Sequence, residues 1–104
     1  MAFERIMGLW VSNDERYQQY RAGMMPILNR YGGAFGYDFR VSEVLLSKVN
    51  EKINRVFTIE FPDQKSMDEF FCDPAYLAVK EAHFDASVKS KTVISLHEKI
   101  QGSA

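Results

Sequence analysis

The chain has 104 residues, of which 46% are hydrophobic and 13% are aromatic. A chain of this length builds one hydrophobic core, and this composition excludes an intrinsically disordered protein. Thirteen basic and fourteen acidic side chains leave a net charge of −1. Lysine and arginine do not cluster, so nucleic acid is not an expected partner.

No apolar run approaches the roughly 18 residues that a membrane-spanning helix needs, and residues 1–5 lack the features of a signal peptide. Cys72 is the single cysteine, which excludes an intrachain disulfide and a cysteine-based metal site. The sequence therefore predicts a cytoplasmic protein without a membrane segment.

Residues 3–11 alternate as a strand that is apolar on both faces, and Ser12 then opens a Ser-x-x-Glu capping box. Apolar side chains at steps of three and four predict a helix up to about residue 31. Pro26 should kink or tighten this helix, and Gly32-Gly33 should end it.

A second strand is predicted from Phe35 to Val41, with a bulge or bend near Ser42 where the apolar phase slips. Residues 47–54 read as a polar hairpin loop that leads to a third strand at 55–61. The second half then predicts a helix capped by Asp63, a restart at Asp73-Pro74, a helical segment over 75–87 and a last strand over 91–98.

This order, strand-helix-strand-strand-helix-strand, predicts an α+β domain of the ferredoxin-like kind over residues 1–100, with 101–104 as a frayed tail. Two helical stretches cover one face of a four-stranded antiparallel sheet, and the strand pattern leaves the other face apolar. A homodimer that buries this face against its own copy, a dimeric α/β barrel, is therefore expected.

Three segments carry a family resemblance: YRAGMMPILNRYGG at 20–33, VFTIEFPD at 56–63 and DPAY at 73–76. They resemble the bacterial family called domain of unknown function 1330, and the resemblance spans most of the chain. The resemblance implies membership of the dimeric α/β-barrel superfamily, which includes small monooxygenases, muconolactone isomerases and haem-binding peroxidases. Leu45-Leu46 stands where that family usually has Glu-Gly, and His83 replaces an Arg of its last helix.

His83 and Glu60 are the predicted catalytic residues. His83 lies on an apolar helical stripe, and histidine titrates near neutral pH, which suits a general base. Glu60 interrupts the apolar pattern of a strand, where burial would raise the pKa of its carboxyl and suit it to acid or base catalysis. The structural alternatives are a boundary histidine with one hydrogen bond, and a glutamate that is solvated or paired with Arg55 or Arg40.

Trp10, Tyr37, Asp38 and Arg40 are the predicted ligand-binding residues. The two aromatic residues, with Tyr17, Tyr20 and Tyr31 of the first helix, could shape a cavity for a flat organic ligand. Asp38 and Arg40 should share one sheet face and could line a polar pocket. The alternatives are aromatic residues that simply fill the core and an ion pair at the surface.

No metal site is expected, because His83 and His97 lack ligand spacing, and no cofactor is expected. Gly32-Gly33 follows a helix instead of opening one, which argues against nucleotide binding. The resulting hypothesis is a homodimer with a small-molecule pocket, as a cofactor-free oxygenase or isomerase acting on a small organic compound. The alternative is a non-catalytic dimer that binds a metabolite or a partner protein.

Overall fold

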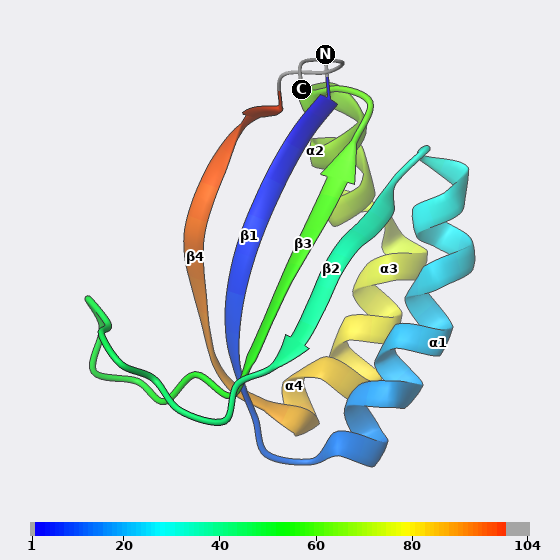
Figure 1. Ribbon diagram of the computed structural model, residues 1–104. Helices are drawn as coiled ribbons and strands as arrows, with labels where there is room; N and C mark the ends of the chain where they lie inside the picture. The colour runs from blue at the N-terminus through cyan, green and yellow to red at the C-terminus, as the bar shows by residue number, and fades with distance from the viewer. Residues whose placement is uncertain (1, 100–104) are drawn as a thin grey trace.

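A computed structural model describes residues 2–99 of the chain (Figure 1). The elements in chain order are β1 (Ala2–Val11), α1 (Asp14–Arg30), β2 (Ala34–Arg40), β3 (Arg55–Phe61), α2 (Gln64–Cys72), α3 (Pro74–Val79), the π-helical turn η1 (Lys80–Phe84), α4 (Asp85–Ser87) and β4 (Val88–Lys99). The four strands form one antiparallel sheet in the order β2-β3-β1-β4. This is the ferredoxin-like topology, and it confirms the predicted fold class. The predicted tail, 101–104, lies outside the described residues.

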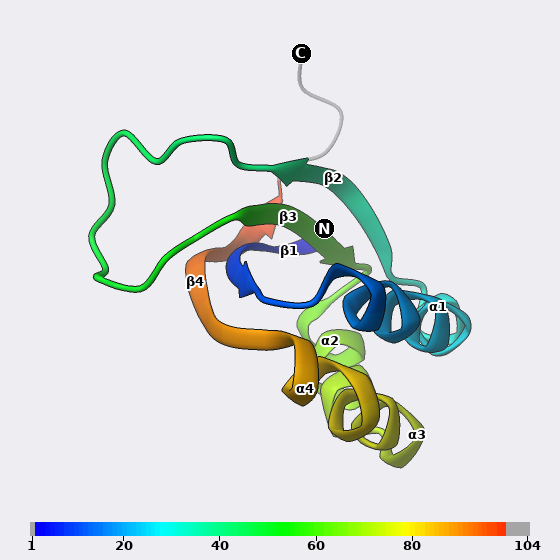
Figure 2. The ribbon, with the colours of Figure 1, turned by 90° about the horizontal axis from the view of Figure 1, so that it is seen from below.

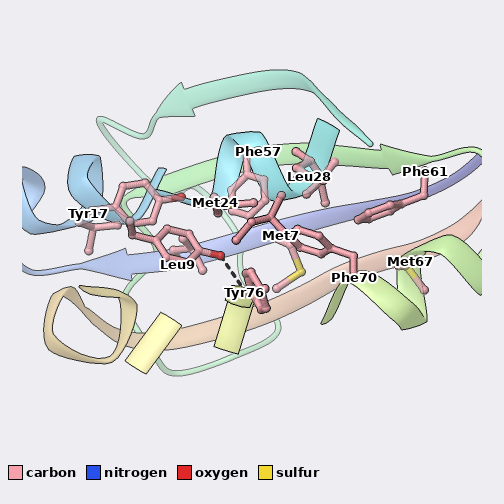
Figure 3. Packing of buried hydrophobic residues seen from close by; sticks show 14 residues of the cluster. Met7, Leu9, Tyr17, Met24, Leu28, Phe57, Phe61, Met67, Phe70 and Tyr76 are labelled. Carbon is pink, nitrogen blue, oxygen red and sulfur yellow. Dashed lines mark hydrogen bonds between the residues drawn. The ribbon is translucent and has the colours of Figure 1, made fainter. Parts of the chain in front are cut away.

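All the helices lie on one side of the sheet, as the view along the strands in Figure 2 shows. On β3 the alternate residues from Phe57 to Phe61 are buried against them, whereas their neighbours are half-buried. Sheet and helices enclose a core of aliphatic, methionine and aromatic side chains (Figure 3), among them Met7, Leu9, Tyr17, Met24, Leu28, Phe57, Phe61, Met67, Phe70 and Tyr76. No helix among residues 2–99 lies over the opposite side of the sheet, which we call the open face.

The start of α1 lies one residue beyond the predicted capping box. Asn13 is the N-cap, because its side-chain oxygen accepts a 3.0 Å hydrogen bond from the backbone N–H of Arg16. The backbone N–H and the hydroxyl of Ser12 instead both donate to the carbonyl oxygen of Ser87. The predicted capping role of Ser12 is therefore wrong, and Ser12 joins the start of α1 to the end of α4.

Pro26 lies inside α1, which continues to Arg30 without a break in its helical assignment. The proline is exposed, so water can satisfy the carbonyl that loses its helical donor. The predicted end of the helix is confirmed, because Tyr31 is the C-cap and Gly32 has a φ of 72°. Glycine reaches this left-handed conformation without a steric cost.

The predicted caps of the later helices are confirmed: the Asp63 side chain accepts from the N–H of Ser66, and that of Asp73 from the N–H of Ala75. The bulge in β2 lies elsewhere than predicted. Its register shifts between Phe35 and Asp38, well before Ser42, which lies outside the strand. The bulge reverses the side-chain phase, so that Phe35 and Asp38 both face the helices.

β4 also departs from the simple alternation of a strand over 91–98, which would place Thr92, Ile94 and Leu96 on one face. Its register with β1 shifts opposite Ile6 and Met7. Leu96 and Val93 consequently face the helices, whereas Ile94 lies next to Gly8 on the open face. Ile94 is therefore the extra residue of a bulge that the sequence did not predict for this strand.

Candidate functional site

A cavity of about 420 Å³ lies between the sheet and the helices. The sheet contributes a floor of largely apolar side chains, namely Arg5, Met7, Leu9, Phe57 and Ile59. The helices contribute most of the opposite wall, with Tyr20, Met24, Met67, Phe71, Tyr76 and Phe84. Aromatic rings and flexible methionine side chains form a surface that adapts to flat apolar molecules.

Two tyrosine hydroxyls meet at the wall of this cavity. Tyr20 of α1 and Tyr76 of α3 are both buried, and their oxygen atoms lie 2.9 Å apart (dashed line to Tyr76 in Figure 3). Burial raises the pKa of both hydroxyls, so both stay protonated at neutral pH. One proton is used between the two oxygens, and the other remains free to donate. The pair can therefore hold a ligand oxygen, but it cannot act as a base.

Arg5 brings a positive charge to the floor of the cavity. It lies on β1 between neighbours Ile59 and Leu96, on the side that faces the helices. Its guanidinium carbon lies 4.7 Å from the centre of the Phe71 ring, and its Nε is buried without a hydrogen-bond partner among residues 2–99. Burial lowers the pKa of Arg5, although an arginine remains charged at neutral pH.

Asp68, Lys80 and Lys91 complete the titratable groups of the cavity wall. Lys80 belongs to the π-helical turn η1 and pairs with Asp85 at 3.0 Å. Phe84, at the other end of the same turn, also lines the cavity. Single π-helical turns often occur at functional sites, because the inserted residue redirects its neighbours.

The structure places none of the six predicted site residues in this cavity. Asp38 faces the helices but is held by arginines: Arg55 donates two hydrogen bonds of 2.8 Å, and Arg21 lies 3.0 Å away. Arg40 is exposed and pairs with Asp14 at 3.8 Å. Asp38 and Arg40 therefore do not pair with each other.

Trp10, Tyr37 and Glu60 lie on the open face instead. The Tyr37 ring stacks on Phe39, with centroids 5.7 Å apart. The carboxylate of Glu60 accepts a 3.0 Å hydrogen bond from Lys99. These three residues are separated from the cavity by the sheet itself.

His83 is half-buried in η1, and its Nδ1 has no partner among the described residues. Neither His83 nor Glu60 lines the cavity. The hypothesis that these two residues border one pocket is therefore not supported by the geometry, and their catalytic role stays a prediction.

Arg5 is a candidate site residue that the sequence did not predict. It occupies a cavity-facing position of β1 in phase with Phe3, Met7 and Leu9, so a charged residue on an apolar strand face was the available signal. Tyr76 belongs to the DPAY motif and to the apolar helical stripe of His83, and neither pattern predicts its contact with Tyr20. Its pairing with Tyr20 joins positions far apart in the sequence, which no local pattern shows.

Neither a metal-ligand cluster nor a helix fit to cross a membrane occurs within residues 2–99. No three His, Cys, Asp or Glu side chains in this range gather as a set of metal ligands. No helix in this range has the length and apolar character to cross a membrane.

Comparison with known proteins gives a family and a fold. The family model described as domain of unknown function (DUF1330) matches residues 5–96. Among curated proteins, none matches the sequence significantly.

Three solved structures illustrate the fold. A protein of unknown function from Rhodopseudomonas palustris is 19% identical with a TM-score of 0.79, over 97% of this chain and 84% of that one. A dabb family protein with a ferredoxin-like fold from Mesorhizobium loti is 15% identical with a TM-score of 0.65, over 95% and 97%. SnoaB, a cofactor-independent oxygenase from Streptomyces nogalater, is 14% identical with a TM-score of 0.53, over 97% and 96%. At these identities the likeness establishes the fold alone.

Proposed function

Because this chain belongs to the family described as domain of unknown function (DUF1330), which names no reaction, we propose from its own geometry that it binds a small organic molecule in the cavity between sheet and helices. The observation that carries this proposal is a cavity of about 420 Å³ with aromatic and methionine walls, into which four charged side chains and two tyrosines also bring polar groups. Ligand sites in proteins typically measure roughly 300–1,000 Å³ and have this composition. The occupant is a compound with a flat apolar body and at least one oxygen.

The catalytic form of the proposal is a cofactor-free oxygenase or isomerase. Such reactions pass through an enolate or a related oxyanion, which needs hydrogen-bond donors and positive charge. Arg5 and the Tyr20–Tyr76 pair offer both, and Asp68 is a carboxylate on the same wall. SnoaB, which has this fold, is a cofactor-independent oxygenase. The alternative is a non-catalytic protein that uses the same cavity to bind a metabolite.

We also propose that the protein is a homodimer that buries the open face. Tyr37 and Phe39 are 65% and 55% exposed there, although both are aromatic. A second hollow on this side of the sheet is lined mainly by apolar residues, including Val44, Leu45, Leu46, Ile53, Val56 and Ile94. A face of this kind on a protein of this size favours a two-fold interface with a second copy.

Methionine methyl groups give a direct test of the cavity. Met7, Met24 and Met67 line it, whereas Met25, on the exposed side of α1, does not. With ¹³C-labelled methionine methyls, a library of small aromatic and oxygenated compounds is titrated and followed by NMR. A ligand in the cavity should shift the methyl resonances of the three lining methionines and leave the methyl resonance of Met25 unchanged. If no compound shifts the lining methyls, or if shifts are confined to Met25, the proposal fails.

A second measurement separates the catalytic form from simple binding. Each compound that shifts the lining methyls is incubated in air, and oxygen uptake and product formation are recorded. Turnover that exceeds the protein-free rate supports the oxygenase or isomerase. Saturable binding without turnover of any bound compound favours the metabolite-binding alternative.

A further inference from the structure

The cavity is more positively charged than the chain as a whole. The protein carries a net charge of −1, yet the cavity wall holds three cationic side chains, Arg5, Lys80 and Lys91, against one acidic side chain, Asp68. Lys80 is already paired with Asp85. The remaining positive charge is concentrated on the floor, at Arg5, and at Lys91 of β4.

Arg5 differs from the other inward-facing arginines of the sheet and α1. Arg21 and Arg55 both contact the carboxylate of Asp38 at 3.0 and 2.8 Å. Arg5 has no carboxylate within 4.0 Å among residues 2–99, and its Nε is buried without an acceptor. A partly buried guanidinium without an acceptor is destabilising, which makes a bound anion the natural complement.

Two other polar groups of the cavity wall, Tyr20 and Tyr76, are also donors, whereas the carboxylate of Asp68 is an acceptor that makes no ion pair with Arg5 within 4.0 Å among residues 2–99. The Tyr20–Tyr76 pair retains one free O–H, because the two hydroxyls share a single hydrogen bond. Rings surround these donors: Phe71 lies beside the Arg5 guanidinium, and Phe35 and Phe57 line the same cavity. The cavity therefore combines an apolar body with donors that lack an acceptor.

We propose that the occupant of this cavity is an aromatic or conjugated carboxylate, whose charged group pairs with Arg5 and whose ring system lies among the aromatic walls. This inference rests on the proposed function and adds the charge of the ligand to it. The planar guanidinium matches a carboxylate in shape, and paired charge-assisted hydrogen bonds are among the strongest in proteins.

The test uses two probes of nearly equal shape, 2-naphthoate and its neutral amide, 2-naphthamide. Their affinities for the full chain are measured by calorimetry, and their location by the methionine methyl shifts. We expect the naphthoate to bind about ten- to a hundredfold more tightly than the amide, as a charge-assisted pair implies. Arg5→Gln should remove this preference, and Arg5→Lys should keep part of it. Arg30→Gln, at an exposed arginine of α1 outside the cavity, should leave it unchanged.

The outcomes separate this inference from the proposed function. If both probes bind in the cavity equally well, or if Arg5→Gln keeps the preference, the carboxylate inference is overturned and the proposed function stands. If neither probe nor any library compound reaches the lining methyls, the proposed function fails, and the inference fails with it. If Arg5→Gln does not fold, the test is the NMR resonance of the Arg5 Nε–H group in the wild-type protein. Naphthoate, but not naphthamide, should shift that resonance, and equal shifts would overturn the inference.

Discussion

The carboxylate of Asp38 on β2 accepts two hydrogen bonds of 2.8 Å from the guanidinium of Arg55, the residue that begins β3. Arg55 is 7% exposed and its guanidinium carbon lies 5.0 Å from the centre of the Tyr17 ring. Arg21 approaches the same carboxylate from α1. One carboxylate therefore bridges two arginines, leaving one positive charge uncompensated, and ties the edge strand β2 to α1 and β3.

This arrangement predicts a specific loss of stability in acid. The hydrogen bonds from Arg55 hold the pKa of Asp38 below its usual value of 3.8. A lowered pKa in the folded state means that the stabilisation is complete above pH 3.8 and disappears as the pH falls through the folded-state pKa. Urea unfolding between pH 2 and 7 measures this loss. The free energy of unfolding of Asp38→Asn should fall less steeply towards low pH, the acid limb of the curve, than that of the wild type.

At neutral pH, Asp38→Asn should cost about 2 kcal/mol of unfolding free energy, less than the roughly 3–5 kcal/mol of a fully buried pair, because Asp38 is partly exposed. Asp14→Asn is the matched control, since Asp14 pairs with the exposed Arg40 at 3.8 Å. It should change stability by at most about 0.5 kcal/mol. An acid limb as steep in Asp38→Asn as in the wild type would contradict the assignment.

Asp38 also shows why the sequence predicted the fold better than the site. Periodicity and capping residues were enough for the topology, because each strand and helix carries its own local signal. The bulge between Phe35 and Asp38 has no such signal. The bulge turns Tyr37 and Phe39 towards the open face and Asp38 towards Arg55. Simple alternation from Phe35 therefore assigns every residue of β2 beyond the bulge to the wrong face of the sheet. Arg5 does have a local signal, because it is a charged residue in phase with Phe3, Met7 and Leu9. The apolar residues around it nevertheless dominate the alternation of this strand.

The proposed dimer predicts that a charge on the open face separates the subunits. Phe39→Glu places a carboxylate beside Tyr37 on a surface that the dimer would bury, and burying an unpaired charge is unfavourable. Light scattering should give the wild type a mass of twice the 12.0 kDa of one chain, and the variant a single-chain mass. Met25→Glu, on the exposed side of α1, is the control and should remain dimeric. A wild type with the mass of one chain would contradict the proposal.

The predicted catalytic role of His83 and Glu60 can be tested apart from binding. Glu60 makes an ion pair with Lys99 at 3.0 Å on the open face, so Glu60→Gln should change stability by less than about 1 kcal/mol. Because neither residue borders the cavity, Glu60→Gln and His83→Asn should leave the affinity of a cavity ligand unchanged. For any compound that is turned over, a lower rate at unchanged affinity would support the catalytic prediction. A wild-type rate in both variants would contradict it.

The last prediction concerns the hydroxyl pair of Tyr20 and Tyr76. Tyr20→Phe or Tyr76→Phe removes one partner of a buried hydrogen bond and leaves the other hydroxyl without it, so each should cost about 1–2 kcal/mol in urea unfolding. The double variant removes both polar groups together. Its cost should therefore be smaller than the sum of the two single costs, by about 1 kcal/mol.

A second cycle, between Tyr20→Phe and Tyr31→Phe, is the control. Tyr20 lies on α1 and Tyr31 is the C-cap of the same helix, roughly 16 Å away along the helix axis, and the Tyr31 hydroxyl donates to Asp73 instead. These two changes should add to within about 0.5 kcal/mol. Equal coupling in both cycles would mean that the effect reports on α1 as a whole. Coupling confined to Tyr20 and Tyr76 would establish that the two hydroxyls act on each other at the cavity wall, as their 2.9 Å separation implies.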